Sequence, residues 1–388
     1  MTLAHISRLI LLADTLDKSK YEIHIAHNGK YSCFIDMYGW QNHIIPGISQ
    51  EKFHERIRKI TPLFTSSEIR EILQAEEKLL LELKPDLIVA DYLQYAAALL
   101  AEKLKIPIFT VIDPHWSPFS MQEFPVPENP IVDFLGIRTV RKLLPIFKPL
   151  FLLMHKGNLD KIRKSMGLPI LKEFKENYVT GTKILYAGIP SIGLTENIPE
   201  NHYYIGAVCW EPPMELPERF TKLPSDKPIV YVSFGSSGDV RLLEKIIAVL
   251  KKMNLVGIIT TAGRSEIQES ENILIEKFLP ASKIIQKASL VIGNGGSPVV
   301  YQALSRGVPI LGIPSNIDQY FTMESVEKNK VGILLRSGYV SEDALESAIG
   351  RLLADKEVRD NAKNLQREIS EYDAKKIFSK MVDNFLKE

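Results

Sequence analysis

The chain has 388 residues, of which 45% are hydrophobic and 24% are charged, and its formal net charge at pH 7 is +1. With this balance, overall charge does not attract the protein to nucleic acid or to an acidic surface. The two cysteines, Cys33 and Cys209, are too few for a disulfide framework and lack the clustered spacing of a zinc site. We therefore expect a reducing, cytoplasmic location and no nucleic-acid partner.

The first half of the chain alternates amphipathic helices with short apolar runs, which is typical of a parallel sheet covered on both faces. Helices are predicted at residues 6–16, 69–83 and 94–104, and strands at 21–26, 86–90 and 106–112. Arg8 and Asp14 interrupt the N-terminal apolar stretch, so a typical signal peptide is not expected. No uncharged apolar run reaches the ~20 residues that a membrane span needs.

Two proline-rich stretches interrupt this alternation. Residues 113–130 suit a long irregular loop and residues 201–228 an interdomain linker, because proline opposes regular structure. The alternation then restarts, with strands at 228–234, 256–261, 290–292 and 310–313 and helices at 240–253, 298–305, 319–329, 341–353 and 356–387. We expect one doubly wound domain at 1–205, a linker at 206–227, a second such domain at 228–365 and a C-terminal helix at 366–388.

Two glycine-rich turns in the second half each follow a strand and precede a helix. VSFGSSGDV contains the turn at 235–238, and LVIGNGGSPVVYQAL contains the turn at 293–297. Glycine lets the backbone approach a phosphate closely, and the N-terminus of the following helix favours negative charge. A single turn of this kind is equally compatible with a tight connection that needs positive φ, but two in one domain favour a phosphate-bearing ligand.

A third strand, in ILGIPSNIDQ, is followed by the polar residues Ser315, Asn316, Asp318 and Gln319. Carboxylate and amide groups suit the hydroxyls of a sugar. The same residues suit the capping of a helix that begins near Gln319, and the residue types alone favour neither role.

From FLPASKII through GNGGSPVVYQALSRGVPILGIPSNIDQYF, the second half resembles the nucleotide-sugar signature of family 1 glycosyltransferases, notably the bacterial macrolide- and flavonoid-type enzymes. VYVSFGSSG resembles the first phosphate loop of that family. The resemblance implies the GT-B fold, with two Rossmann-like domains facing a cleft and a C-terminal helix that crosses back to the first domain. It also implies inverting transfer of a hexose from a nucleoside diphosphate sugar, expected to be a UDP-sugar, to a hydroxyl of an apolar small-molecule or lipid acceptor.

By resemblance, the donor is bound by the second domain, with no cofactor and no metal ion. The residues carried over to this role are Ser236, Phe278, Leu279, Pro280, Asn294, Gly295, Gly296, Ser297, Gln302, Asp318 and Gln319. Three positions depart from the family pattern: Asn294 stands where a phosphate-binding histidine is usual, Val299 replaces Ser or Thr, and Gln302 replaces a ribose-binding Glu. Asn carries no charge and Gln binds a hydroxyl more weakly than a carboxylate does, so these changes bear on affinity and donor identity.

The resemblance places the catalytic pair in the first half. His5 matches the general base of the family, and Asp91, at the end of LIVAD, matches the aspartate that orients it. Imidazole titrates near neutral pH and can accept a hydroxyl proton, while a carboxylate on its other nitrogen selects the tautomer. Asp113 and His115, which follow a predicted strand, are expected to contact the acceptor.

Two alternative functions stay open from the sequence. A UDP-GlcNAc 2-epimerase uses the same scaffold and donor, and a non-catalytic nucleotide-sugar-binding protein is compatible with Asn294, Val299 and Gln302. The stretch 138–164 carries eight basic residues and one acid among many apolar ones. It suits peripheral contact with anionic lipid or, equally in pattern, an ordinary helix with a solvated basic face.

The N-terminus departs from the family in one further respect. The family's first domain opens with a β-strand and a glycine turn before the histidine, whereas Met1 stands four positions before His5. Four residues are too short for a central strand at ~3.3 Å per residue. We therefore expect the first strand of this domain to be missing, and the natural start to lie upstream or the chain to be a truncated, weakly active form.

Overall fold

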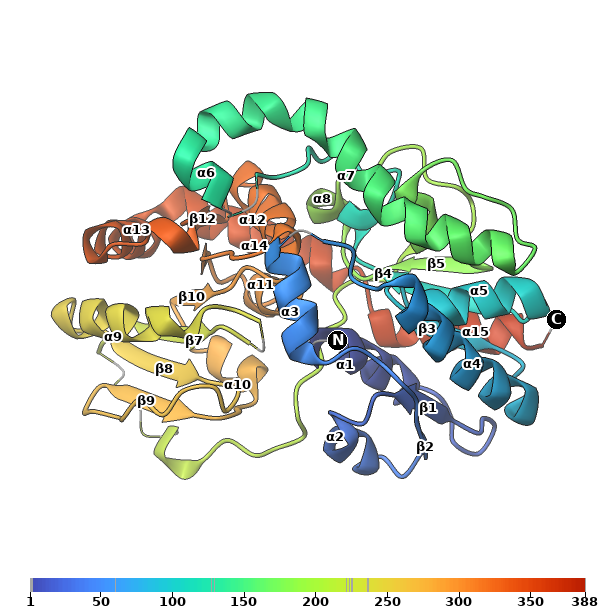
Figure 1. Ribbon diagram of the computed structural model, residues 1–388. Coiled ribbons are helices and arrows are strands. Elements are labelled where there is room, and N and C mark those ends of the chain that lie inside the picture. The colour runs from blue at the N-terminus through green and yellow to red at the C-terminus, as the bar shows by residue number, and fades with distance from the viewer. Residues whose placement is uncertain are drawn as a thin grey trace. The chain divides into compact units, whose positions relative to one another are not determined.

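The computed structural model describes residues 3–59, 61–126, 128, 130–220, 222, 224, 226–235 and 237–387. The chain divides into two compact units (Figure 1). Unit 1 comprises Met1–Phe124, Asn129–Val208 and Tyr372–Glu388, and unit 2 comprises Pro125–Glu128 and Cys209–Glu371. The chain therefore passes from unit 1 into unit 2 at two places along its length and returns each time.

Unit 1 is built on two separate parallel sheets. The larger has the order β3-β4-β5-β6, formed by β3 (Ile88–Asp91), β4 (Ile108–Ile112), β5 (Lys183–Tyr186) and β6 (His202–Tyr204). The smaller pairs β1 (His24–His27) with β2 (Gln41–Ile44). Among the described residues the first element is a helix, α1 (Leu3–Ala13), and no strand precedes it.

Helices cover both faces of the larger sheet. The other helices of unit 1 are α2 (Ser32–Asp36), α3 (Gln50–Lys59), α4 (Ser66–Leu83), α5 (Tyr95–Leu104), α6 (Pro130–Leu135), α7 (Ile137–Ser165), α8 (Pro190–Gly193) and α15 (Ala374–Phe385). Ile112 and Ile184 pack with residues of α4, α5 and α7, whereas Phe109 and Leu185 pack with residues of α1 and α15. This alternation follows from the two-residue repeat of a strand, and it buries the sheet between two apolar layers.

Unit 2 contains one six-stranded parallel sheet with the order β12-β11-β10-β7-β8-β9. Its strands are β7 (Ile229–Ser233), β8 (Val256–Thr260), β9 (Ile273–Glu276), β10 (Leu290–Gly293), β11 (Ile310–Gly312) and β12 (Gly332–Leu334). Its helices are α9 (Leu243–Lys252), α10 (Ala281–Ile285), α11 (Ser297–Leu304), α12 (Ile317–Lys328), α13 (Glu342–Ala354) and α14 (Lys356–Ser370). Chain order reverses between β7 and β10, and this reversal marks the usual ligand-binding position of a doubly wound sheet.

The short excursion of residues 125–128 into unit 2 is held by one carboxylate. Glu128 accepts hydrogen bonds from the Tyr320 hydroxyl (2.6 Å), the Ser337 hydroxyl (2.9 Å) and the Gly338 amide (2.9 Å). Arg336 donates to the carbonyl of Val126 at 3.1 Å and stacks over the Tyr320 ring. The sequence indicated an irregular loop here, but nothing in its composition indicated that the end of the loop joins the second unit.

The order of elements agrees with the α/β prediction, but several strands were not predicted. These are β2, β5, β6, β9 and β12, each only three or four residues long. β6 begins at His202, inside the proline-rich stretch at 201–228, so the start of that stretch belongs to the sheet of unit 1. None of the described helices combines the length and the apolar composition needed to cross a bilayer.

One buried acid in α4 gives unit 1 a pH-dependent stability. Glu76 is 6% exposed on the face of α4 that bears Ile69, Ile72 and Leu73, and in the described part of the chain its Oε2 has no hydrogen-bond partner. Burial raises the pKa of Glu76 from 4.5 to about 8. The folded chain thus keeps a proton that the unfolded chain releases, and the free energy of unfolding falls as the pH rises from 4.5 to about 8.

Glu76→Gln removes the charge and should raise the melting temperature of the protein at pH 8 by several degrees, with little change at pH 5. The measurement is thermal unfolding between pH 5 and 8.5, and the matched control is Glu71→Gln at an exposed position of the same helix. Equal pH profiles for wild type and Glu76→Gln would contradict the buried-acid interpretation.

Candidate functional site

The two glycine-rich turns lie next to each other at the carboxyl edge of the sheet in unit 2. The last residues of β7 and β10, Ser233 and Gly293, are paired in the sheet, so the turns that follow them are neighbours at the point where chain order reverses. Gly235 and Gly295 have φ values of +52° and +73°, which side chains rarely adopt. A side chain at Gly295 would also collide with Met323. Both glycines are thus required by the backbone.

The hydroxyl of Ser237 connects the two glycine-rich turns with the loop that follows β11. Ser237 Oγ accepts hydrogen bonds from Asn294 Nδ2 (3.3 Å) and from Gln319 Nε2 (3.2 Å). Asn294 also donates to the carbonyl of Phe234 and accepts from the amide of Gly296, and it is 7% exposed. Gln319 is 2% exposed and accepts from the amide of Ser315. The loops after β7, β10 and β11 therefore form one hydrogen-bonded assembly.

At the start of helix α12, the N-cap is Asn316 and not Asp318. Asn316 is the N-cap, and its side chain accepts a hydrogen bond from the backbone amide of Gln319 at 3.1 Å. The capping role that the sequence left open is thus carried by Asn316. Asp318, in the first turn, is half-buried, and its carbonyl oxygen accepts a hydrogen bond from Thr322 Oγ1 at 3.2 Å.

Arg264 is a residue that sequence reasoning missed. Its Nη1 donates to the carbonyl of Gly235 (3.0 Å) and its Nη2 to the carbonyl of Gly238 (2.7 Å), so the guanidinium brackets the first glycine-rich turn. Arg264 follows β8, the strand beside β7, in the sequence TTAGRS. A basic residue after a glycine at the end of a strand was the available signal. The side chain brings positive charge to the turn that was predicted to hold phosphate.

The remaining predicted donor residues that the structure describes lie on or just before helices α10 and α11 of the same unit. Pro280 is the N-cap residue of α10, with Leu279 buried and Phe278 half-buried before it. Ser297 begins α11, and Gln302 lies half-buried on that helix. Ser236 lies outside the described residues.

In unit 1, the predicted catalytic pair is in contact. Nδ1 of His5, in the first half of α1, lies 3.0 Å from Oδ2 of Asp91, the last residue of β3. The side chains are 13% and 0% exposed, respectively. The other oxygen of Asp91 accepts the backbone amide of Leu93 at 3.0 Å. Both carboxylate oxygens are therefore occupied, which holds the carboxylate in one orientation toward the imidazole.

A second acid–base pair lies one helical turn away. Arg8 and Asp113 are each 3% exposed, and Nη2–Oδ1 and Nη1–Oδ2 are both 2.7 Å, a bidentate ion pair. Asp113 directly follows β4, the neighbour of β3. His5 and Arg8 thus attach α1 to the ends of two adjacent strands. The carboxylate of Asp113, predicted to contact the acceptor, is engaged by Arg8 within the protein.

His115, the other predicted acceptor residue, is 4% exposed in the short 3-10 helix Pro114–Trp116. Its carbonyl accepts a hydrogen bond from Lys175 Nζ at 2.9 Å. Burial lowers the pKa of Lys175 to about 8. Lys175 also reaches the carbonyl of Ser117, so this buried amine supports the backbone on which His115 lies.

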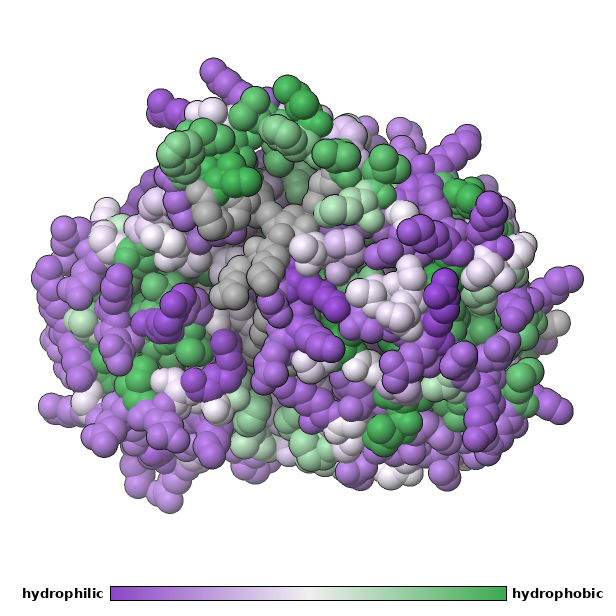
Figure 2. Space-filling model, in the orientation of Figure 1, coloured by the Kyte–Doolittle hydropathy of each residue, from purple (hydrophilic) through white to green (hydrophobic). Residues whose placement is uncertain are grey.

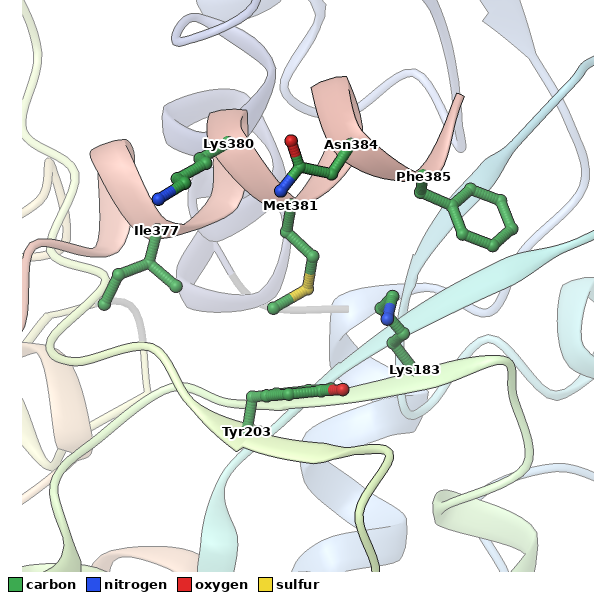
Figure 3. Close-up of a pocket in the computed structure, with 7 residues that line it drawn as sticks. All are labelled: Lys183, Tyr203, Ile377, Lys380, Met381, Asn384 and Phe385. Carbon is green, nitrogen blue, oxygen red and sulfur yellow. The ribbon is translucent and has the colours of Figure 1, made fainter. Parts of the chain in front are cut away.

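A separate cavity in unit 1 lies away from these strand ends (Figure 3). It has a volume of about 360 Å³ and is lined by Lys183, Tyr203, Ile377, Lys380, Met381, Asn384 and Phe385. Lys183 is the first residue of β5, and the other residues come from β6 and α15. The cavity is thus at the opposite end of β5 from the carboxyl edge that holds Asp91 and Asp113, and it is not part of the candidate site.

Comparison with known proteins shows which family the chain is similar to. Residues 244–382 match the family model described as Erythromycin biosynthesis protein CIII-like, C-terminal domain. The chain is 32% identical over 366 residues to a PGL/p-HBAD biosynthesis glycosyltransferase of Mycobacterium tuberculosis strain H37Ra, covering 94% of this chain and 85% of the relative. It is 31% identical to a PGL/p-HBAD biosynthesis rhamnosyltransferase of Mycobacterium bovis strain BCG / Pasteur, covering 94% of this chain and 81% of the relative.

Solved structures share the fold at lower identity. The spinosyn rhamnosyltransferase SpnG superposes with a TM-score of 0.73 at 17% identity, over 98% of each chain, and has also been solved with thymidine diphosphate and with spinosyn aglycone. SnogD from Streptomyces nogalater superposes with a TM-score of 0.70 at 19% identity, over 98% of this chain and 96% of that one. The chain shares its fold with these structures, which is the GT-B fold of α/β glycosyltransferases. The chain belongs to the family 1 glycosyltransferases, and it is a hexosyltransferase.

Removing one partner of the Arg8–Asp113 pair should destabilise the folded protein. Arg8→Met leaves a buried, unpaired carboxylate and should lower the free energy of unfolding by about 3–5 kcal/mol, and Arg8→Met with Asp113→Leu should restore most of that loss. The measurement is urea unfolding. Lys103→Met is the control, since Lys103 pairs with Glu77 at the surface and an exposed pair contributes at most about 1 kcal/mol. A loss from Arg8→Met no larger than the control would contradict the argument.

Proposed function

We propose that the protein is an inverting, metal-independent hexosyltransferase that moves a hexose from a nucleoside diphosphate sugar to a hydroxyl of an apolar acceptor. The observation that supports this most directly is the contact between His5 Nδ1 and Asp91 Oδ2 at 3.0 Å. Because Nδ1 donates to the carboxylate, Nε2 is the nitrogen that can accept a proton. The curated relatives are glycosyltransferases, which does not favour the epimerase or the non-catalytic alternative.

In the proposed reaction His5 is the general base. Its Nε2 takes the proton of the acceptor hydroxyl while the acceptor oxygen forms a bond to the anomeric carbon. The bond between that carbon and the diphosphate oxygen breaks on the opposite face, and the nucleoside diphosphate leaves with the electron pair. The carboxylate of Asp91 holds the tautomer and stabilises the imidazolium that forms.

The donor site of the proposal lies at the glycine-rich turns of unit 2. Asn294 donates to Ser237 and to the carbonyl of Phe234, so its amide orders the loops and adds no charge for the diphosphate. Positive character comes instead from the N-terminus of α11 and from Arg264. The proposal keeps Asp318 and Gln319 for the hexose, the segment 278–280 for the base, and Gln302 for the ribose.

The proposal also concerns the nucleotide and the acceptor. UDP is the nucleotide that the sequence resemblance implies, and the solved neighbour SpnG binds thymidine diphosphate. Gln302 offers one acceptor oxygen where the family carries a carboxylate, which weakens the recognition of two ribose hydroxyls. The relatives are named for PGL/p-HBAD biosynthesis. The proposal keeps the acceptor that the sequence resemblance implies, an apolar molecule carrying a hydroxyl.

The catalytic pair is tested by separating turnover from nucleotide binding. His5→Ala should lower kcat by 10²-fold or more, on the order expected for loss of a general base, while the Kd for nucleoside diphosphate stays within about twofold. Asp91→Asn should lower kcat heavily as well, because the amide no longer selects the tautomer. Turnover and calorimetric binding are measured on the same preparations. Parallel loss of both in His5→Ala would remove His5 from the proposed role.

The donor is tested with a thermal-shift panel of UDP-, dTDP- and GDP-hexoses. A true ligand at 100 times its Kd should stabilise the protein by about 2.7 kcal/mol. Asp318→Ala should weaken binding of the nucleotide sugar about tenfold and binding of the free nucleotide much less, if the carboxylate meets the hexose. The control is Asp360→Ala on α14, distant in sequence from the turns. Equal losses for both ligands would show that Asp318 does not contact the sugar.

A further inference from the structure

The largest exposed apolar side chains of unit 1 gather on α6 and the first half of α7. Phe134 is 88% exposed, Ile146 69% and Leu150 66%. The same surface, which we call the α6–α7 patch, consists of Ile131, Phe134, Leu135, Ile146, Phe147, Leu150, Leu153 and Met154. Figure 2 shows the hydrophobic surface over these two helices. Monomeric soluble proteins seldom leave so many large apolar groups together at the surface.

The spacing within α7 turns these side chains to one side. Residues 146, 147, 150, 153 and 154 fall at i, i+1, i+4, i+7 and i+8, which is one continuous stripe of a helix. The residues that pack into the core of unit 1 are others, mainly Leu152, Leu159 and Ile162. The first half of α7 therefore has an apolar stripe in addition to the face that anchors the helix.

Charge along the first part of α7 has a single sign, whereas α6 carries one exposed acid, Asp133. Between residues 137 and 154 the chain carries Arg138, Arg141, Lys142 and Lys148 and no acidic residue. Arg138 and Lys142 are exposed and four residues apart, so they lie along one border of the stripe. The second half of α7 differs, since Lys156 there is paired with Asp160 and Arg163 is buried against Glu102. Within the part of the chain that the structure describes, Arg138, Arg141 and Lys142 form no ion pair, so their positive charge lies beside the exposed apolar groups.

From this arrangement we propose that the α6–α7 patch docks the enzyme on an anionic lipid surface, with Phe134, Phe147 and Leu150 inserted among the acyl chains. Arg138, Arg141 and Lys142 meet the headgroups. The patch differs from the basic stretch at 138–164, because it includes residues of α6 and its apolar groups end at Met154. A second copy of the chain is a poorer partner, because a symmetric contact would bring the same cations together. The docking concerns where the enzyme works and is measurable without any turnover.

The test is co-sedimentation of the full chain with vesicles of phosphatidylcholine alone or with 30% phosphatidylglycerol, at about 50 mM and about 500 mM salt. Wild type should bind the anionic vesicles at least tenfold more strongly than the neutral ones, and high salt should remove most of that difference. The variant Phe134→Ser/Phe147→Ser/Leu150→Ser should lose at least tenfold in binding at both salt concentrations. Arg138→Gln/Arg141→Gln/Lys142→Gln should lose a similar factor at low salt only.

Matched controls come from elsewhere in unit 1. Leu81→Ser/Ile170→Ser removes two exposed apolar side chains outside the patch, and Lys161→Gln/Lys164→Gln removes two exposed cations from the other half of α7. Both controls should bind vesicles as wild type does, and all variants should keep the wild-type melting temperature within a few degrees.

Three results would overturn the proposal. The first is no binding of wild type to anionic vesicles. The second is equal loss in the patch variants and in their controls. The third is a wild-type dimer in light scattering that the apolar patch variant converts to monomer, without vesicle binding by either form. Because none of these readouts involves sugar transfer, failure of the docking proposal and failure of the proposed function are separate results.

Discussion

All strand pairs in the described sheets are parallel, and this constraint determines where polar groups collect. In a parallel sheet the carboxyl ends of neighbouring strands share one edge, and the loops and helix N-termini there present free backbone amides. In unit 1 the residues at that edge are Asp91 and Asp113, and in unit 2 they are the glycine-rich turns after β7 and β10. Each unit therefore concentrates its chemistry at one edge of its sheet.

Helix α1 meets two buried carboxylates at this edge in different ways. His5 and Arg8 are three residues apart, about one helical turn, and each engages the carboxylate at the end of a different strand. The guanidinium is always charged and forms a two-pronged ion pair, which suits a structural attachment. The imidazole of His5 keeps one nitrogen for a second partner, which suits proton transfer. The two pairs together align the helix that carries the proposed base.

In unit 2 one departure from the family pattern, Asn294, takes part in the hydrogen bonds that join the loops. The side-chain amides of Asn294 and Gln319 both donate a hydrogen bond to the hydroxyl of Ser237. Their amide oxygens accept hydrogen bonds from the backbone amides of Gly296 and Ser315, respectively. Buried polar groups are costly when they are left without partners, so this assembly holds three loops in one arrangement before any ligand arrives. Asn294 brings no charge to this assembly, and Arg264 is a cation that contacts the carbonyls of Gly235 and Gly238 in the loop after β7.

The sequence by itself determined the α/β class and the elements that carry long periodic patterns, because apolar repeats are local properties. The family resemblance singled out His5 and Asp91 as a pair, and the structure brings their side chains into contact. The sequence did not reveal β2, β5, β6, β9 and β12, which depend on the hydrogen bonds that a neighbouring strand offers. It also did not indicate the Arg8–Asp113 pair or the attachment of Glu128 to Tyr320, whose partners lie 105 and 192 residues apart. Only tertiary structure decided these, because the cost of burying a charge selects its partner from whatever the fold brings within reach.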